Sequence, residues 1–141
     1  MSEVSQVNNT RNQLTSNYDF SKIFIGDNKY RKVTLAATAA LNVKIGTVIG
    51  AVGATIGIYK SGTSNQLPIG VIAETVVMPS SGTLEVTIVN AGKIAEGKLV
   101  LNGTDTLATV VSNRTIRDMI ISNTIGVELV TVDELSATDN V

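Results

Sequence analysis

One stretch of the chain constrains the fold more than any other. Residues 45–62 read IGTVIGAVGATIGIYKSG, with glycines at positions 46, 50, 53, 57 and 62 and mostly small or β-branched residues between them. β-branched residues favour strands, and glycines within strands mark bends, bulges or close backbone approaches. The stretch therefore predicts two short strands, residues 47–52 and 55–60, with Gly53 helping to turn the chain between them.

Two other interpretations of this stretch fail on spacing. A Walker A phosphate loop needs Lys directly after its second glycine, but Thr63 follows Gly62, and the chain contains no Gly-x-Gly of a dinucleotide fingerprint. A membrane-spanning helix needs about 20 apolar residues. The most apolar window, residues 43–58, contains four glycines and Lys44, and Lys60 follows closely after it. These glycines are therefore expected to shape a β-domain.

The composition disfavours most catalytic chemistries. The 141 residues include no histidine and no cysteine, which removes the commonest general base, the thiol nucleophile and the usual zinc ligands. Eleven basic and twelve acidic residues leave a net charge of −1, which offers no footprint for nucleic acid or an anionic membrane. We therefore expect no enzyme, no catalytic residues, no cofactor or metal, and no nucleic-acid or membrane partner.

The chain divides into three expected parts: an N-terminal arm over residues 1–17, a β-rich domain over residues 18–132 and an acidic tail over residues 133–141. The arm is rich in Ser, Asn, Gln and Thr, which predicts a mobile segment when the protein is free. It is either a disordered terminus without a role or a segment that orders on a partner by adding a strand to an exposed sheet edge. In the second case, its candidate contacts with the partner are the aliphatic side chains Val4, Val7 and Leu14.

Alternating and apolar segments between turn signals predict the strands of the domain. Residues 83–89 alternate cleanly between apolar and polar side chains, and residues 67–78 form a mostly apolar run. Residues 97–103 predict a further strand that closes on an Asn-Gly turn. Turn or break signals are expected at Gly26-Asp27-Asn28 and at Asn90-Ala91-Gly92.

A single helix is expected near the C-terminus, where Ile116, Ile120 and Ile121 lie near helical spacing. Ser112 or Asn113 is the expected N-cap. At the other end, either Gly126 lies just beyond the helix or Asn123 is its C-terminal left-handed residue. The fold class is therefore mainly β, or β-rich α+β: a small barrel-like β-domain with one short C-terminal helix and a mobile N-terminal arm.

Charged and hydroxyl side chains offer weak candidates for a site. Four carboxylates flanked by apolar residues are expected to point outward from strands or turns: Glu74, Glu85, Glu96 and Glu128. Lys60-Ser61 fits Ser-Lys chemistry but fits a turn better. Arg114 and Arg117 lie three residues apart on the expected helix, which suits either a solvated face or a contact with a partner or another copy.

The order of these segments resembles the lambda-type head decoration proteins of tailed phages. The Gly-Thr-Val-hydrophobic-Gly pattern lies at residues 46–50, a tyrosine-bearing strand follows at Tyr59, and Gly-hydrophobic-hydrophobic-Ala lies at residues 70–73. A strand that ends at Gly92 and a short helix that runs into a last strand, residues 116–130, complete the resemblance.

The resemblance covers residues 20–130 and departs from the family in two places. Ala37-Thr38 stands where the family often has Ala-Gly, so this turn is expected to differ. The N-terminal arm is longer and richer in Asn than is typical, and residues 131–141 extend beyond the usual end. Either extension is a candidate anchor for another head or fibre protein.

The resemblance implies a structural virion protein without catalysis. It implies a homotrimer that binds the outside of the phage head, with the N-terminal arms ordered on the major capsid protein, so that the shell is stabilised. The protein would be made in the host cytoplasm and placed on the outer capsid surface. The alternative is a head-fibre base or adhesin-like binding module that attaches another virion component or a glycan.

Overall fold

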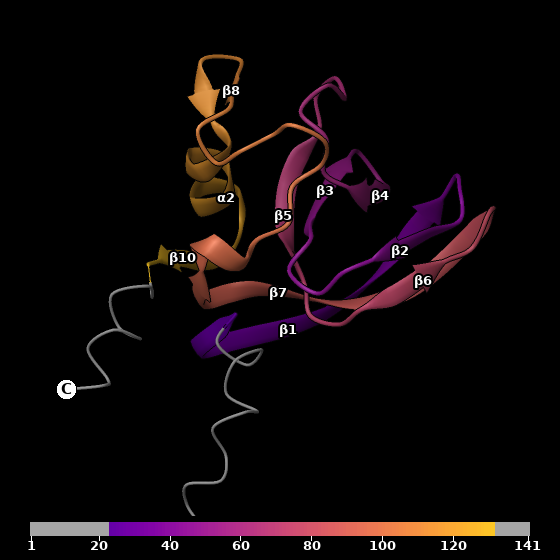
Figure 1. Cartoon of the computed structure of the whole chain (residues 1–141), viewed down its shortest axis with the longest axis horizontal. Helices are drawn as coiled ribbons and strands as arrows, with labels where there is room; N and C mark the ends of the chain where they lie inside the picture. Colours follow the sequence, from indigo (N-terminus) through magenta and orange to yellow (C-terminus); the bar gives the residue numbers. More distant parts are fainter. Residues whose placement is uncertain (1–22, 132–141) are drawn as a thin grey trace, which may run out of the picture.

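A computed structural model describes residues 23–131 of the chain. The expected arm, residues 1–17, and the expected acidic tail, residues 133–141, lie outside the described residues, and so do Val4, Val7 and Leu14. The ribbon formed by β1 (Phe24–Ala37) and β7 (Gly82–Ala95) extends along the molecule (Figure 1). At one end of it lie α2 (Ile116–Asn123) and β10 (Gly126–Val130), and at the other end lie β2 (Leu41–Val43) and β6 (Val76–Met78).

The fold is mainly β, as predicted, with one α-helix within residues 23–131. The largest sheet has strand order β1-β7-β5-β3-β4, with β10 also paired to β7. Its strands are β1 (Phe24–Ala37), β3 (Val48–Val52), β4 (Thr55–Ile58), β5 (Leu67–Ile72), β7 (Gly82–Ala95) and β10 (Gly126–Val130). The other elements are β2 (Leu41–Val43), β6 (Val76–Met78), η3 (Glu96–Lys98), β8 (Val110–Val111), β9 (Arg114–Thr115) and α2 (Ile116–Asn123). The sheets do not close, so the domain is not a complete barrel.

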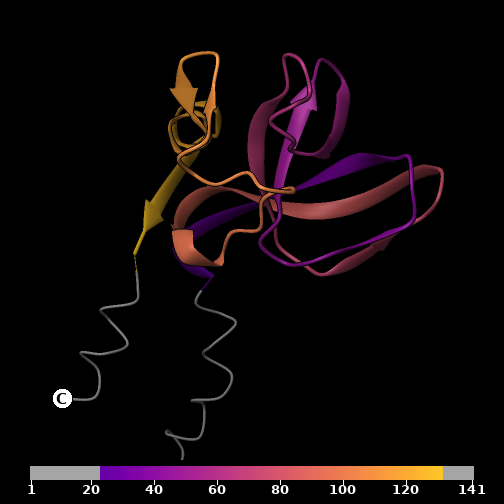
Figure 2. The same ribbon diagram turned by 45° about the horizontal axis from the view of Figure 1, so that its top comes forward.

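Two apolar clusters form the core, and the central strands contribute to both. On β7, Ile88 belongs to one cluster and the next residue, Val89, to the other, and both side chains are fully buried. Successive strand residues point to opposite faces, so both faces of the sheet are covered here. The cluster around Val89 includes residues of α2, whereas the cluster around Ile88 includes β2 and β6. Figure 2 shows these two groups of elements on either side of the central strands.

The glycine-rich stretch folds as predicted, into two strands and a turn. β3 and β4 pair antiparallel, and Gly53 between them has φ +59°. Gly50 is needed for close packing: a Cβ there would lie 3.0 Å from both Gln66 Cγ and Tyr59 Cδ1. The glycines therefore give the hairpin its shape, as the spacing indicated.

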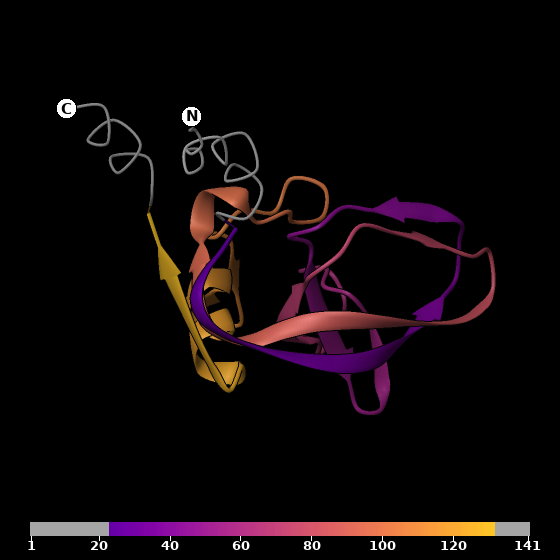
Figure 3. The same cartoon turned by 90° about the horizontal axis from the view of Figure 1, so that it is seen from below.

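The turn expected at Gly26-Asp27-Asn28 and the break expected at Asn90-Ala91-Gly92 are both wrong. β1 and β7 are each 14 residues long, and both strands continue through these positions without a break. The turn-favouring residues instead form an irregularity in the β1–β7 pairing, with φ +55° at Asp27 and +101° at Gly92. The Asn28 side chain donates to the carbonyl groups of Ala91 and Lys93. Figure 3 shows the continuous, curved β1–β7 ribbon that results.

The strand expected over residues 97–103 is also wrong. Its first residues form η3, and only Val100 makes a bridge, with Thr47. Leu99 and Leu101 still pack against the core, so the apolar alternation here reflects burial of these two side chains and not pairing in a sheet. The apolar run 67–78 divides into β5 and β6, which belong to two different sheets.

The helix lies where it was predicted, but its expected N-cap is wrong. Thr115 is the N-cap, and its hydroxyl accepts a hydrogen bond from the Asp118 backbone N–H. Ser112 and Asn113 instead turn the chain between β8 and β9, with φ values of +54° and +70°. The helix ends at Asn123, with Thr124 as its C-cap and Gly126 beyond its end, as expected. The alternative, Asn123 as a left-handed C-terminal residue, is wrong, because its φ is not positive.

The first and last described residues lie at the same end of the molecule. The Ala95 backbone N–H, at the end of β7, donates to the carbonyl of Ile23 at 2.8 Å. Val130, at the end of β10, is the register partner of the same Ala95. Ile23 and Val130 therefore lie on either side of Ala95, at the same end of β7.

Candidate functional site

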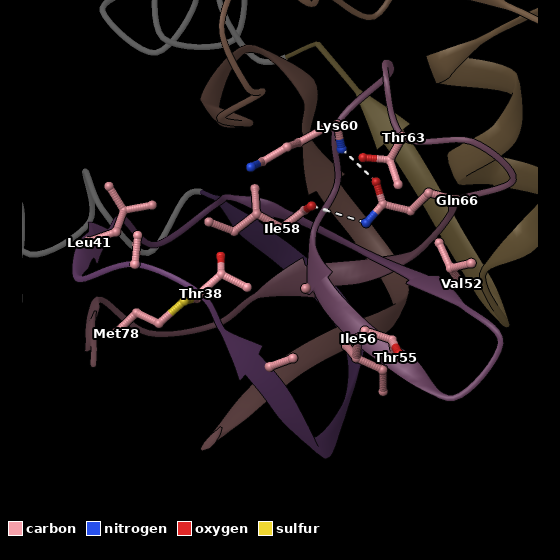
Figure 4. Close-up of a pocket in the computed structure, with 13 residues that line it drawn as sticks. Thr38, Leu41, Val52, Thr55, Ile56, Ile58, Lys60, Thr63, Gln66 and Met78 are labelled. Carbon is pink, nitrogen blue, oxygen red and sulfur yellow. Dashed lines mark hydrogen bonds between the residues drawn. The ribbon is translucent and has the colours of Figure 1, made fainter. Parts of the chain in front are cut away.

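A pocket of about 240 Å³ lies between β4, the end of β1 and the β2–β6 pair. Figure 4 shows the side chains that line it. The larger apolar ones come from four strands: Leu41, Val52, Ile56, Ile58 and Met78. Leu41 is 50% exposed at the pocket edge, whereas Met78 is buried. An apolar hollow with an exposed aliphatic edge suits the side chain of another protein.

The polar side chains of this pocket are mainly neutral. They are Thr38, Thr55, Lys60, Thr63 and Gln66, and Lys60 is the one charged residue among the lining residues. Since no carboxylate lines the pocket, it offers no acid–base pair and no cation site of its own. An apolar group with a neighbouring carboxylate or amide would match this lining.

Gln66 holds the pocket wall in place. Its side-chain oxygen accepts from the Lys60 backbone N–H at 2.8 Å, and its side-chain nitrogen donates to the Ile58 carbonyl at 3.1 Å (Figure 4). Gln66 is buried, and its two hydrogen bonds continue the edge of β4 into the 61–66 loop. Nothing in the apolar and glycine pattern of the sequence indicated this side-chain bridge.

The Lys60-Ser61 pair forms a turn, which matches the preferred interpretation of the sequence. The Ser61 backbone N–H and hydroxyl both donate to the Asp105 carboxylate, at 3.0 and 2.6 Å. Because the hydroxyl hydrogen is directed at a carboxylate, Ser61 is held as part of a loop-to-loop contact. Asp105 thereby ties the Asn-Gly turn region to the end of the β3–β4 hairpin.

The other polar candidates lie outside this pocket. Arg117 forms an ion pair with Glu96, and Arg114 bonds to Ser122 and to the Asp118 carbonyl on the helix. Glu74 accepts from the Thr87 backbone N–H. Glu96 and Glu74 thus have structural partners, and the structure does not bring the four carboxylates together. Among the described residues, no group of three or more carboxylates is placed to hold a metal ion.

Tyr59 belongs to the core cluster around Val89, and its buried hydroxyl has no hydrogen-bond partner among the described residues. Burial, reinforced by the Asp105 carboxylate, raises the pKa of Tyr59 above its ordinary value of 10.0. Above pH 10 the unfolded chain therefore loses this proton before the folded chain does. Its contribution to stability is complete below pH 10 and is lost as the pH rises through the folded-state pKa.

We expect Tyr59→Phe to weaken the alkaline destabilisation of the domain. In the wild type, ionisation of Tyr59 can lower the free energy of unfolding by up to about 1.4 kcal/mol per pH unit. The variant lacks this ionisation. Urea unfolding between pH 8 and pH 11 measures the difference. Tyr30→Phe is the matched control, because Tyr30 is 60% exposed and should keep the wild-type slope. Equal slopes for the two variants would contradict the assignment.

Comparison with known proteins adds no family to these observations: no family model matches the chain, and the search of curated proteins finds no match. Within residues 23–131, no helix has the length and apolar character needed to cross a membrane.

Proposed function

We propose that this protein is a capsid decoration protein of a tailed phage, which binds the outside of the head as a trimer and stabilises it. The resemblance in segment order is the basis of the proposal, and the mainly β fold agrees with it. In this proposal, residues 1–17 contact the major capsid protein through Val4, Val7 and Leu14. The domain supplies a rigid base from which the arms extend.

The position of the two ends of the described chain is the structural observation that supports the proposal most. Ile23 and Val130 lie on either side of Ala95, so the described chain begins and ends at the same end of β7. A polar arm of 17 residues can span up to about 60 Å when extended. An arm of that reach, starting beside the tail, lets one corner of each copy face the shell while the rest of the domain stays outside.

Deletion of residues 2–17 tests the proposed role of the arm. We expect the truncated chain to lose binding to decoration-free capsids, because several arms per oligomer turn weak contacts into avidity. Co-sedimentation with such capsids measures the bound fraction. A matched variant with Val4, Val7 and Leu14 all changed to Ser keeps the arm length and should lose binding as well. Unchanged binding by both variants would remove the arm from the proposal.

The pocket edged by Leu41 favours a second candidate function, that of a binding module at a head fibre or another virion component. Its apolar lining and single Lys60 suit a protein ligand. Copy number separates the two functions: decoration requires hundreds of copies per head at three-fold positions, whereas a fibre base requires a few. Counting the chain in purified virions by quantitative mass spectrometry decides between them.

A further inference from the structure

A second hollow, of about 610 Å³, lies where α2 and β10 meet β7, and we call it the α2–β10 trough. Its floor contains the small residues Ala91, Gly92 and Gly126, and two isoleucines, Ile121 and Ile125, stand beside them. Ile121 is 45% exposed and Ile125 is 76% exposed. Protruding aliphatic side chains therefore lie next to a shallow floor on which an aliphatic side chain could pack.

Gly126 is smaller than the fold of a single copy requires. Its φ is not in the left-handed region, and a Cβ there would meet only the Ala91 Cβ, at an ordinary 3.8 Å. Glycine inside a strand weakens it, and often marks a bulge, a bend, or a place where a ligand or another backbone approaches closely. At Gly126 that approach does not come from the described residues, which leaves the solvent side of the trough.

The charges around the trough balance each other. Lys29 and Lys93 supply two cations, Asp27 and Glu128 supply two carboxylates, and all four residues are exposed. A surface of zero net charge that carries both signs can pair with itself, whereas a strongly charged partner would gain nothing from it. The free side of β1 differs, because Arg31 and Lys32 on it oppose the addition of another strand.

We propose that the α2–β10 trough is the surface through which copies of this chain associate, with Ile125 of one copy packed on the small-residue floor of the next. In a closed ring such as a trimer each contact is head to tail, so the projecting Ile125 of one copy meets the floor of the next, and the balanced charges around the trough do not oppose this contact. The inference rests on the self-association part of the proposed function and adds the residues that carry it.

The test is sedimentation velocity of the full chain over a series of protein concentrations. Ile125→Asp places a charge in the contact, and Gly126→Leu fills the floor. Each should weaken association by at least about thirtyfold, the effect of losing a central interface contact. Val77→Asp is the matched control, because Val77 is 70% exposed on β6, away from the trough, and it should associate like the wild type. Circular dichroism establishes that each variant is folded.

The inference is overturned if the wild type is monomeric at every concentration, or if folded Ile125→Asp and Gly126→Leu associate normally. The same variants in the capsid co-sedimentation assay separate this inference from the proposed function. If the oligomers depend on the trough but do not bind capsids, the inference holds and the proposed capsid role is wrong. A monomer whose capsid binding is lost on Ile125→Asp makes the capsid protein the occupant of the trough and overturns self-association.

Discussion

Gly92→Ala is expected to destabilise the domain by about 4 kcal/mol, because two separate costs add at this position. The φ of Gly92 is +101°, which side chains other than glycine rarely adopt. A Cβ at Gly92 would also lie 2.5 Å from the Asp27 carbonyl oxygen and 2.6 Å from its carbon, and both belong to the backbone of β1. Neither cost can be relieved without moving β1 away from β7. Chemical denaturation monitored by circular dichroism measures the loss.

Two matched glycines separate these two costs. Gly82 has φ +91° but open space where a Cβ would be, so Gly82→Ala should show the conformational cost alone, about 1–2 kcal/mol. Gly62 has neither a left-handed φ nor a close neighbour, so Gly62→Ala should be close to neutral. If Gly92→Ala cost no more than Gly82→Ala, the close contact with Asp27 would have no energetic role.

Gly92 also shows where sequence reasoning reaches its limit. Asn90-Ala91-Gly92 and Gly26-Asp27-Asn28 each carry the residues that turns prefer, and each was predicted to interrupt a strand. The same residues serve equally well in a β-bulge, where two strands share one irregularity. Local composition cannot distinguish these outcomes, because the deciding fact is that the two segments, more than 60 residues apart, lie opposite each other.

Segments whose structure depends on residues close to each other in the sequence were predicted correctly. The β3–β4 hairpin and α2 are of this kind, because glycine spacing and isoleucine periodicity specify them within a few residues. The parallel pairing of β10 with β7 was not predicted, since it depends on where α2 carries the chain. The pocket and the trough were missed for the same reason: Leu41 and Met78, or Ile125 and Gly92, become neighbours only in the folded chain.

Substitution of Gln66 tests the hydrogen bonds that hold the pocket wall. Gln66→Leu keeps a similar shape but leaves the Lys60 backbone N–H and the Ile58 carbonyl without their partner. Each partly buried group loses a hydrogen bond that water replaces incompletely, and the two together are expected to cost about 3 kcal/mol. Gln66→Ala should cost at least as much, because it also removes the side-chain atoms that pack against Gly50.

Gln66→Glu should make this loss depend on pH. The carboxylate can still accept from the Lys60 N–H, but its second oxygen faces the Ile58 carbonyl and repels it, which disfavours the charged form and raises the pKa of the new side chain. The protonated form can donate to Ile58 as the amide does. Stability should therefore be close to the wild type below the unfolded-state pKa of about 4.3 and should fall as the pH rises through the folded-state value. Urea unfolding of Gln66→Glu and Gln66→Leu from pH 3.5 to pH 7 measures this, relative to the wild type. A pH-independent difference between the two variants would show that the Gln66 amide does not bond to the Ile58 carbonyl.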